Sequence, residues 1–329
     1  MDKRNLGPLG PVSVLTLGGG GIGALWGATS REEGIATLRE AVDSGITVLD
    51  AAPGYNVCEE LIGEAFDGRL PAGTLVTSKC GIGAPKPGTV LDTFRASLEK
   101  SLAAMRLDAV DLFFLHGHIA PEPGTADAAI AGRSIGDYTP WSSYVDEVIP
   151  AFLELQREGL ARHWGLTGVD IPGAIIAAVG LEERPAAIQA VTNLLDSPGS
   201  LNGRHAARPR DIIAAADAAG VGVLGIRAVQ AGALTAAIDR PLESDHPEAI
   251  DYAAAAPFRE LCARWGEDPA VVGHRYALAM EGVGSVILGV KNREELRQLI
   301  AAATPLEPER VAEIDALGLR LAWVAAGGT

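Results

Sequence analysis

The chain has 329 residues, of which 48% are hydrophobic and 21% are charged, and its formal net charge is −15. This length is ample for a large core, and the acidic balance argues against nucleic acid or an anionic membrane as a partner. No apolar run approaches the ~20 residues that span a bilayer, the N-terminus lacks a secretory signal, and three scattered cysteines favour a reducing cytoplasm.

Short runs rich in Val, Ile and Leu recur along the chain, and most are nearly continuous rather than alternating. Continuous hydrophobic runs are typical of strands that are buried on both faces of a parallel sheet. We therefore expect strands at about residues 12–17, 46–50, 74–79, 109–115, 162–166, 186–191, 221–226 and 284–288.

Helical patterns lie between these runs. The sequence Ser30-Arg31-Glu32-Glu33 is a capping box that opens the first helix, and Gly45, Gly159 and Gly220 stand where helices should stop. Strands that alternate with helices predict a single (β/α)8 TIM barrel of the α/β class over residues 1–329. The expected helices are 31–44, 57–66, 89–104, 146–158, 170–179, 208–219, 257–281 and 293–302.

The barrel leaves surplus length in three places. These are residues 117–145, residues 227–250, and the tail after Pro305, in which 308–323 has a helical pattern. We expect all three to lie at or near the carboxyl face of the barrel, where long loops shape a substrate pocket.

Four polar residues stand at or just past the ends of successive strand-like runs. Asp50 closes the second run, Tyr55 follows five residues later, Lys79 ends the third run, and His116 follows the fourth. The carboxyl ends of parallel strands are where a β/α barrel assembles its chemistry. A Tyr, a Lys, an Asp and a His together indicate proton donation to a carbonyl oxygen.

These residues and their surroundings resemble the aldo-keto reductase family. The likeness rests on Asp50-Ala-Ala-Pro-Gly-Tyr55, on Lys79 after Val-Thr-Ser and on Leu115-His116-Gly117, and it extends from Leu6-Gly7 to Ile287-Leu288-Gly289-Val290-Lys291. The resemblance implies a barrel enzyme that transfers a hydride between a nicotinamide cofactor and an aldehyde, ketone or sugar. It also implies that the cofactor lies extended across the mouth of the barrel.

The resemblance assigns a role to each of the four residues. Tyr55 is the general acid, and Lys79 lowers the pKa of its phenol, which is ~10 when unperturbed. Asp50 pairs with Lys79 and keeps it charged. His116 orients the carbonyl oxygen and helps to stabilise its developing negative charge.

The expected cofactor residues depart from the family pattern in several positions. Thr167-Gly168 stands where the family often has Ser-Asn, and Ile226-Arg227 stands where it often has an aromatic residue and Ser. Gln189 matches the glutamine that binds the carboxamide. The full expected set is Gly19, Gly20, Thr167, Gln189, Ile226, Arg227, Gly289, Lys291 and Arg293.

Lys291 and Arg293 follow the last strand, where the family binds the adenosine 2′-phosphate, whereas Glu295 falls where some NADP-preferring members have Arg. We therefore expect NADP, with NAD as the alternative. The substrate is a small carbonyl compound or sugar, and the expected substrate-binding residues are Trp26, His118 and Trp141, with Tyr138, Tyr144 and Trp323 as further candidate walls. The sequence makes no prediction of oligomeric state.

Three other interpretations are weaker. Gly18 to Gly23 fits the dinucleotide fingerprint GxGxxG, but the next helix starts only at Ser30, so we expect a pliable loop there. His116-Gly117-His118 could belong to a metal-dependent hydrolase, but the sixth and eighth strands end without a further ligand, so no metal is expected. A regulatory subunit or sensor that only binds the nicotinamide would not need Asp50, Tyr55 and Lys79 together.

Overall fold

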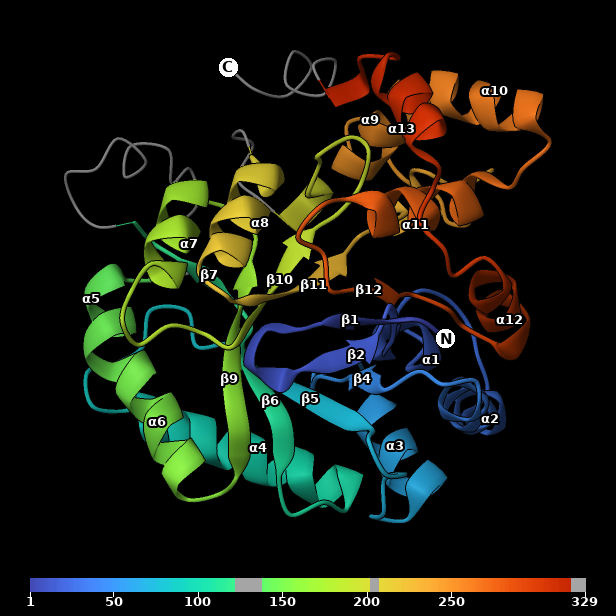
Figure 1. The fold of residues 1–329 in the computed structure, drawn as a ribbon. Coiled ribbons are helices and arrows are strands. Elements are labelled where there is room, and N and C mark those ends of the chain that lie inside the picture. The colour runs from blue at the N-terminus through green and yellow to red at the C-terminus, as the bar shows by residue number, and fades with distance from the viewer. Residues whose placement is uncertain (122–137, 202–206, 321–329) are drawn as a thin grey trace.

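The computed structural model describes residues 1–121, 138–201 and 207–320. Its centre is a closed barrel of parallel strands in the order β10-β11-β12-β3-β4-β5-β6-β9 (Figure 1). The predicted (β/α)8 barrel is confirmed. The barrel strands are β3 (Leu15–Gly18), β4 (Val48–Asp50), β5 (Leu75–Cys80), β6 (Val110–Leu115), β9 (Ala161–Gly168), β10 (Ala187–Val191), β11 (Gly222–Ile226) and β12 (Ser285–Leu288).

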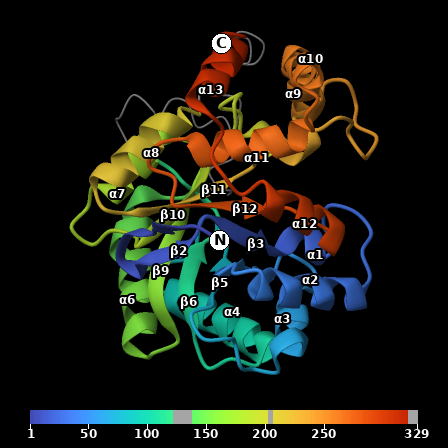
Figure 2. The same ribbon diagram turned by 45° about the vertical axis from the view of Figure 1, so that its right-hand side comes forward.

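Helices surround the barrel and separate its strands in sequence (Figure 2). The predicted cap is present, since the Ser30 hydroxyl accepts a hydrogen bond from the Glu33 amide at 3.1 Å. The helices that cover the barrel are α2 (Arg31–Asp43), α3 (Cys58–Phe66), α4 (Val90–Met105), α6 (Ile149–Arg157), α7 (Pro172–Val179), α8 (Pro209–Ala218), α11 (Pro269–Ala279) and α12 (Arg293–Ala301).

Three further helices group together at one side of the molecule, in orange and red in both ribbon views. They are α9 (Pro247–Ala254), α10 (Ala256–Trp265) and α13 (Pro308–Asp315). The shorter elements are α1 (Gly19–Ile22), α5 (Trp141–Ser143), a π-helical turn at Tyr144–Val148, 3₁₀ turns at Gly7–Leu9, Gly199–Leu201 and Gln230–Gly232, and the strand pair β7 (His118–Ile119) with β8 (Tyr138–Thr139).

Two predicted elements are each divided in the structure. The strand expected at 12–17 breaks at Val14 into β2 (Pro11–Ser13), which pairs antiparallel with β1 (Lys3–Asn5), and the barrel strand β3. The helix expected at 257–281 ends at Gly266, which has a left-handed φ of 70°, and α11 starts again with Asp268 as its cap. Glycine adopts this conformation without a steric penalty, and Pro269 at the first helical position favours a new start.

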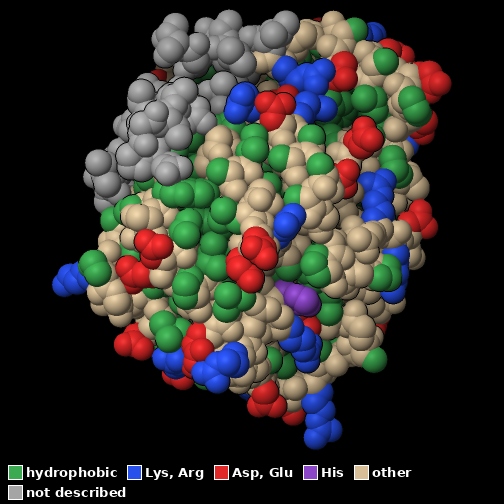
Figure 3. All heavy atoms as spheres, turned by 60° about the vertical axis from the view of Figure 1, so that its left-hand side comes forward, with side chains coloured by type: hydrophobic (Ala, Val, Ile, Leu, Met, Phe, Trp, Pro, Cys, Tyr) green, Lys and Arg blue, Asp and Glu red, His purple; other side chains and the backbone are tan. Residues whose placement is uncertain are grey.

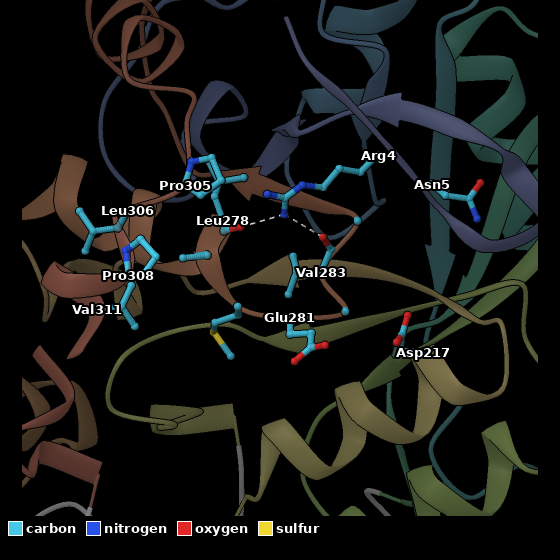
Figure 4. A pocket seen from close by; sticks show the side chains of 14 residues that line it. Arg4, Asn5, Asp217, Leu278, Glu281, Val283, Pro305, Leu306, Pro308 and Val311 are labelled. Atoms are coloured by element: carbon cyan, nitrogen blue, oxygen red, sulfur yellow. Dashed lines mark hydrogen bonds between the residues drawn. The ribbon is translucent and has the colours of Figure 1, made fainter.

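The β1–β2 hairpin closes the amino end of the barrel. Leu6 between its strands is fully buried with Val48, Leu112 and Phe114 of the barrel interior. Arg4 donates hydrogen bonds to the carbonyl oxygens of Leu278 (2.8 Å) and Val283 (3.1 Å), and these contacts lie in a cavity of about 680 Å³ (Figure 4). This cavity lies at the opposite end of the barrel from the strand ends that carry Asp50 and Lys79.

Acidic and basic side chains are interspersed on the face of the molecule that Figure 3 shows. Elsewhere in the described chain, charged side chains form ion pairs between helices or across loops, such as Arg297 with Glu40 and Arg95 with Glu158. Among the described residues, no helix is long and apolar enough to cross a membrane.

Candidate active site

A cavity of about 430 Å³ opens at the carboxyl end of the barrel. It is walled by the strand ends and by the loops after β3, β6 and β11. The residues around it include Gly18–Gly20, Leu25, Trp26, Asp50, Tyr55, His116–His118, Thr167, Val169, Gln189, Leu201, Ile226–Val229, Ala231, Gly232, Asp239, Arg240, His274 and Ile287–Gly289.

Lys79 is the centre of the polar cluster at the floor of this cavity. Its ammonium donates to Asp50 Oδ2 at 2.7 Å and to the carbonyl oxygen of Ala51 at 3.0 Å. The third short contact is to the Tyr55 hydroxyl, at 3.2 Å. Because the Lys79 side chain is fully buried, all three of its donors are directed at protein oxygens rather than at water.

Burial and charge oppose each other in this cluster. Burial disfavours the Lys79 ammonium, but the neighbouring Asp50 and Tyr55 outweigh it, so the pKa of Lys79 is raised. Burial raises the pKa of Tyr55, and the Lys79 ammonium offsets only part of this rise. The net shift of the Tyr55 pKa is therefore upward, whereas its position beside Lys79 led us to expect a downward shift.

His116 lies beside Tyr55 with its ring open to the cavity. The two ring centroids are 6.0 Å apart, and the ring planes are nearly perpendicular, at 87°. Desolvation by the cavity walls and the charge of Lys79 lower the pKa of His116 to about 4. The imidazole is thus neutral at pH 7 and carries one N–H that can donate to an oxygen in the cavity.

Gln189 contacts both the cavity and Asp50. Its amide nitrogen donates to Asp50 Oδ1 at 2.6 Å, and the Thr77 hydroxyl donates to the same oxygen at 2.9 Å. The side chain also lines the cavity. Gln189 therefore belongs to the hydrogen-bonded cluster around Asp50 as well as to the surface that a ligand would touch.

Most of the other expected cofactor residues also line the cavity: Gly19, Gly20, Thr167, Ile226, Arg227 and Gly289. The Thr167 hydroxyl is bonded to the carbonyl oxygen of Leu115 at 3.1 Å. Arg227 forms a buried ion pair with Glu248 and donates to Gln230 Oε1 at 2.8 Å. Its guanidinium is thus already held by protein acceptors at the edge of the cavity.

The glycine run after β3 is packed tightly, and the expectation of a pliable loop is wrong. Gly19 to Ile22 form α1, all of them buried. A Cβ at Gly19 would clash with the Cys58 sulfur, and one at Gly21 would clash with the carbonyl oxygen of Val290. The glycines are required because neighbouring backbone and side chains approach so closely.

Lys291 and Arg293 do not line the cavity. Lys291 Nζ lies 3.1 Å from Asp239 Oδ2 and 3.6 Å from Glu295 Oε1, and Arg293 pairs with Glu33 at 2.9 Å. Both expected phosphate-binding cations therefore already have carboxylate partners, and one of these partners, Asp239, is itself a wall of the cavity.

Of the three expected substrate-binding residues, Trp26 and His118 line the cavity and Trp141 does not. Trp26 lies at the cavity with 44% of its surface exposed, and a Cβ on Gly20 would clash with its indole nitrogen. His118 also lines the cavity, and its Nδ1 lies 3.6 Å from the buried Asp170 carboxylate. Trp141 is not a cavity residue: its ring lies 5.5 Å from that of Tyr144, with which it packs against the core. Trp323 lies outside the described residues.

Three titratable residues line the cavity but were not among those expected from the sequence: Asp239, Arg240 and His274. Asp239 was hidden in a loop that was expected to shape the pocket but whose course could not be derived. His274 lies within α11, is 6% exposed, and shares its Nδ1 with the carbonyl oxygen of Ala270 at 2.8 Å. A buried histidine on a helix has no sequence signal that separates it from a core residue. Within the described ranges, no three His, Cys, Asp or Glu side chains are grouped so as to hold a metal ion.

Residues 14–318 match the model of the aldo/keto reductase family. The chain belongs to this family. Among relatives of this aldo/keto reductase, the L-galactose dehydrogenase of Arabidopsis thaliana is 26% identical over 327 residues, which cover 96% of this chain and 94% of the relative. The uncharacterized oxidoreductase YqkF of Bacillus subtilis (strain 168) is 27% identical over 322 residues, covering 92% and 91% of the two chains.

Solved structures share the fold of this aldo/keto reductase. The aldo-keto reductase AKR11C1 of Bacillus halodurans in its holo form superposes with a TM-score of 0.68 at 24% identity, with 96% of each chain covered. The glycerol dehydrogenase AKR11B4 of Gluconobacter oxydans gives a TM-score of 0.67 at 20% identity, covering 99% of this chain and 96% of the other. The chain is accordingly an oxidoreductase of the aldo/keto reductase family, with the barrel of that family.

Proposed function

We propose that this protein transfers a hydride between a nicotinamide cofactor and a small carbonyl or alcohol substrate, with Tyr55 as the general acid and base. The observation that carries the proposal is the contact of 3.2 Å between the buried Lys79 Nζ and the hydroxyl of Tyr55, a residue that lines the cavity. An ammonium at this distance stabilises a phenolate, so the phenol can release its proton to a carbonyl oxygen and later take it back.

The cavity suits a nicotinamide group. Its wall includes apolar Ile226 and the bare backbone of Gly117 and Gly289, at each of which a Cβ would meet no atom within 4 Å. Ile226, Gln189 and Thr167 are the residues that would hold the ring, and the bound cofactor would supply or accept the hydride. The polar cluster at the floor lies next to this surface, as a proton donor for the same substrate must.

His116 and Tyr55 divide the work on the substrate oxygen. His116 is neutral because its pKa is lowered to about 4, so it offers an N–H without adding charge to the site. Tyr55 carries the transferable proton, and Lys79, anchored on Asp50, remains charged throughout. Charge developing on the substrate oxygen is thus met by two donors from different strand ends.

Both nicotinamide dinucleotides are included in the proposal. The expected preference for NADP rests on Lys291 and Arg293, and a 2′-phosphate would have to compete with Asp239 and Glu295 for Lys291 and with Glu33 for Arg293. These ion pairs weigh against a strong preference for NADP, because a cation that already holds a carboxylate gains less from a phosphate.

The proposed substrates are small aldehydes, ketones and open-chain sugars in the direction of reduction. In the direction of oxidation they are the corresponding alcohols and the lactol forms of sugars. The relative named L-galactose dehydrogenase supports the inclusion of sugars. Trp26 and His118 give the cavity one aromatic and one polar wall near Tyr55, a combination that suits a hydroxylated carbon chain.

The experiment is a substrate screen that follows reduced nicotinamide absorbance in both directions, with aldehydes, ketones and sugars and with NAD and NADP. We expect turnover by the wild-type protein and its near-complete loss in Tyr55→Phe. Cofactor binding is measured in parallel by fluorescence titration. Binding of NADH or NADPH without turnover of any compound would contradict the proposal and favour a regulatory role.

A further inference from the structure

The two oxygens of the Asp50 carboxylate accept hydrogen bonds from different donors. Its Oδ2 accepts from Lys79 at 2.7 Å. Its Oδ1 accepts from the Thr77 hydroxyl at 2.9 Å and from the Gln189 amide at 2.6 Å. The donors come from different strands, β5 and β10, so the carboxylate is held from two sides of the barrel interior. Asp50 itself is 3% exposed.

The ionisation state of Asp50 determines the direction of its hydrogen bonds with Thr77 and Gln189. An ionised carboxylate only accepts hydrogen bonds, so the Thr77 proton must point to Asp50. The Thr77 oxygen then accepts from the Ala51 amide at 3.2 Å. By the same reasoning the Gln189 nitrogen faces Asp50, and its carbonyl oxygen is left for other partners, among which the described residues provide none.

We propose that Thr77 and Gln189 are positioning residues that fix the Asp50 carboxylate, and through it the Lys79 ammonium, at the distance from Tyr55 that proton transfer requires. The inference rests on the proposed function. It assigns these two side chains a task that is separate from contact with the substrate. Thr77 is 1% exposed and does not line the cavity, so whatever it contributes is transmitted through the groups it contacts, the Asp50 carboxylate and the Ala51 amide.

The charge that reaches Tyr55 depends on this anchoring. The titratable groups that face the Tyr55 ring are Lys79 from β5, Asp50 from β4, Cys58 from α3 and His116 after β6. Only Lys79 is cationic, with its Nζ 4.5 Å from the ring centroid. If the Asp50 carboxylate turned away, Lys79 would lose its charged partner and its fixed position beside Tyr55. None of the other groups that face the ring could then stabilise the Tyr55 phenolate in place of Lys79.

The first test compares Thr77→Val with Thr77→Ser. Valine keeps the shape of threonine without the hydroxyl, whereas serine keeps the hydroxyl. In alcohol oxidation Tyr55 must first be ionised, so a weaker hold on Lys79 should move the acidic limb of the kcat profile to higher pH. We expect Thr77→Val to lower kcat at neutral pH by roughly 10- to 100-fold, the equivalent of one hydrogen bond to a charged group. Thr77→Ser should restore most of the rate, and the dissociation constant of the cofactor should not change.

Thr37→Val is the matched control. Thr37 is also fully buried, on α2, and its hydroxyl has no hydrogen-bond partner among the described residues. Thr37→Val should therefore have the same pH profile of kcat as the wild-type protein. Gln189→Met removes the second donor to Asp50, and because Gln189 lines the cavity we expect both a shifted limb and weaker cofactor binding.

A loss in Thr77→Val that is equal at every pH, or no loss at all, would overturn the proposal. A readout that does not need turnover is the ultraviolet titration of tyrosine, with Tyr55→Phe as the reference that identifies the Tyr55 component. We expect Tyr55 to ionise at higher pH in Thr77→Val than in wild type, and an unchanged titration would also overturn the proposal. If wild type turns over no substrate, the proposed function fails, and this titration still decides whether Thr77 positions the pair.

Discussion

Lys79 Nζ lies 3.2 Å from the Tyr55 hydroxyl and 2.7 Å from Asp50 Oδ2, with no solvent-exposed surface on the lysine side chain. The ammonium therefore joins the Asp50 carboxylate to the phenol that we propose as the proton donor. Loss of Asp50 would leave the buried Lys79 ammonium without its charged partner, whereas loss of the Tyr55 hydroxyl would leave that ion pair in place.

Tyr55→Phe removes the transferable proton but leaves the ring. We expect turnover to fall by about 10²–10⁴-fold, the usual contribution of general acid–base catalysis, while cofactor binding remains. Steady-state rates and a fluorescence titration of the cofactor measure the two effects separately. A variant that retains a near-normal rate would remove Tyr55 from the mechanism.

Lys291→Ala tests whether this cation binds a 2′-phosphate. If Lys291 leaves Asp239 to bind the phosphate, the substitution should weaken NADPH binding by roughly 1.5–3 kcal/mol and leave NADH almost unchanged. Dissociation constants of both cofactors are measured on wild type and variant. Equal losses would show that Lys291 serves only its ion pairs with Asp239 and Glu295.

Trp26→Ala and Trp141→Ala form a pair with opposite expectations. Trp26 lines the cavity and is 44% exposed, so its loss should raise the substrate KM with little effect on stability. Trp141 packs against Tyr144 and the core, so its loss should lower the free energy of unfolding and spare the KM. Urea unfolding beside steady-state kinetics distinguishes the two, and a substrate effect confined to Trp141 would contradict this assignment.

Arg227→Met tests the buried ion pair with Glu248. The arginine side chain is 10% exposed and the glutamate side chain 2% exposed. Removing the cation leaves a buried carboxylate without its charged partner, which typically costs about 3–5 kcal/mol of stability. Denaturant unfolding measures this loss. The double variant Arg227→Met/Glu248→Met should recover part of it, and additive losses would contradict the interpretation.

His116 gives the protein a specific sensitivity to acid. Its folded pKa of about 4 lies below the ordinary value of 6.5, so the unfolded chain binds the proton more readily than the folded one. Stability from this group is complete above about pH 6.5 and is lost as the pH falls towards 4. We expect His116→Gln to lose less stability than wild type over this interval, measured by urea midpoints at each pH. An identical pH dependence in the two proteins would show that His116 does not titrate abnormally.

Much of the fold was determined by local sequence. Continuous hydrophobic runs, the Ser30 cap and the glycines after helices predicted the alternation that closes the barrel, because these signals act over a few residues. The strand ends also placed Asp50, Tyr55, Lys79 and His116 on one face, since parallel strands share a direction. The strand break at Val14 was missed because it depends on pairing with different strands, β2 with β1 and β3 with the barrel. The restart of the helix at Asp268 was missed because a single cap stands within a continuous helical pattern.

Tertiary structure alone decided the partners of the site residues. Gln189 reaches Asp50 across 139 positions of sequence, and Arg293 pairs with Glu33 across 260. Sequence identifies which side chains carry charge, but their effect depends on burial and on the partner that folding brings within hydrogen-bond distance. Burial therefore raised the pKa of Tyr55 where its neighbour Lys79 alone would have lowered it, because desolvation depends on the whole surrounding structure and has no local signature in the sequence.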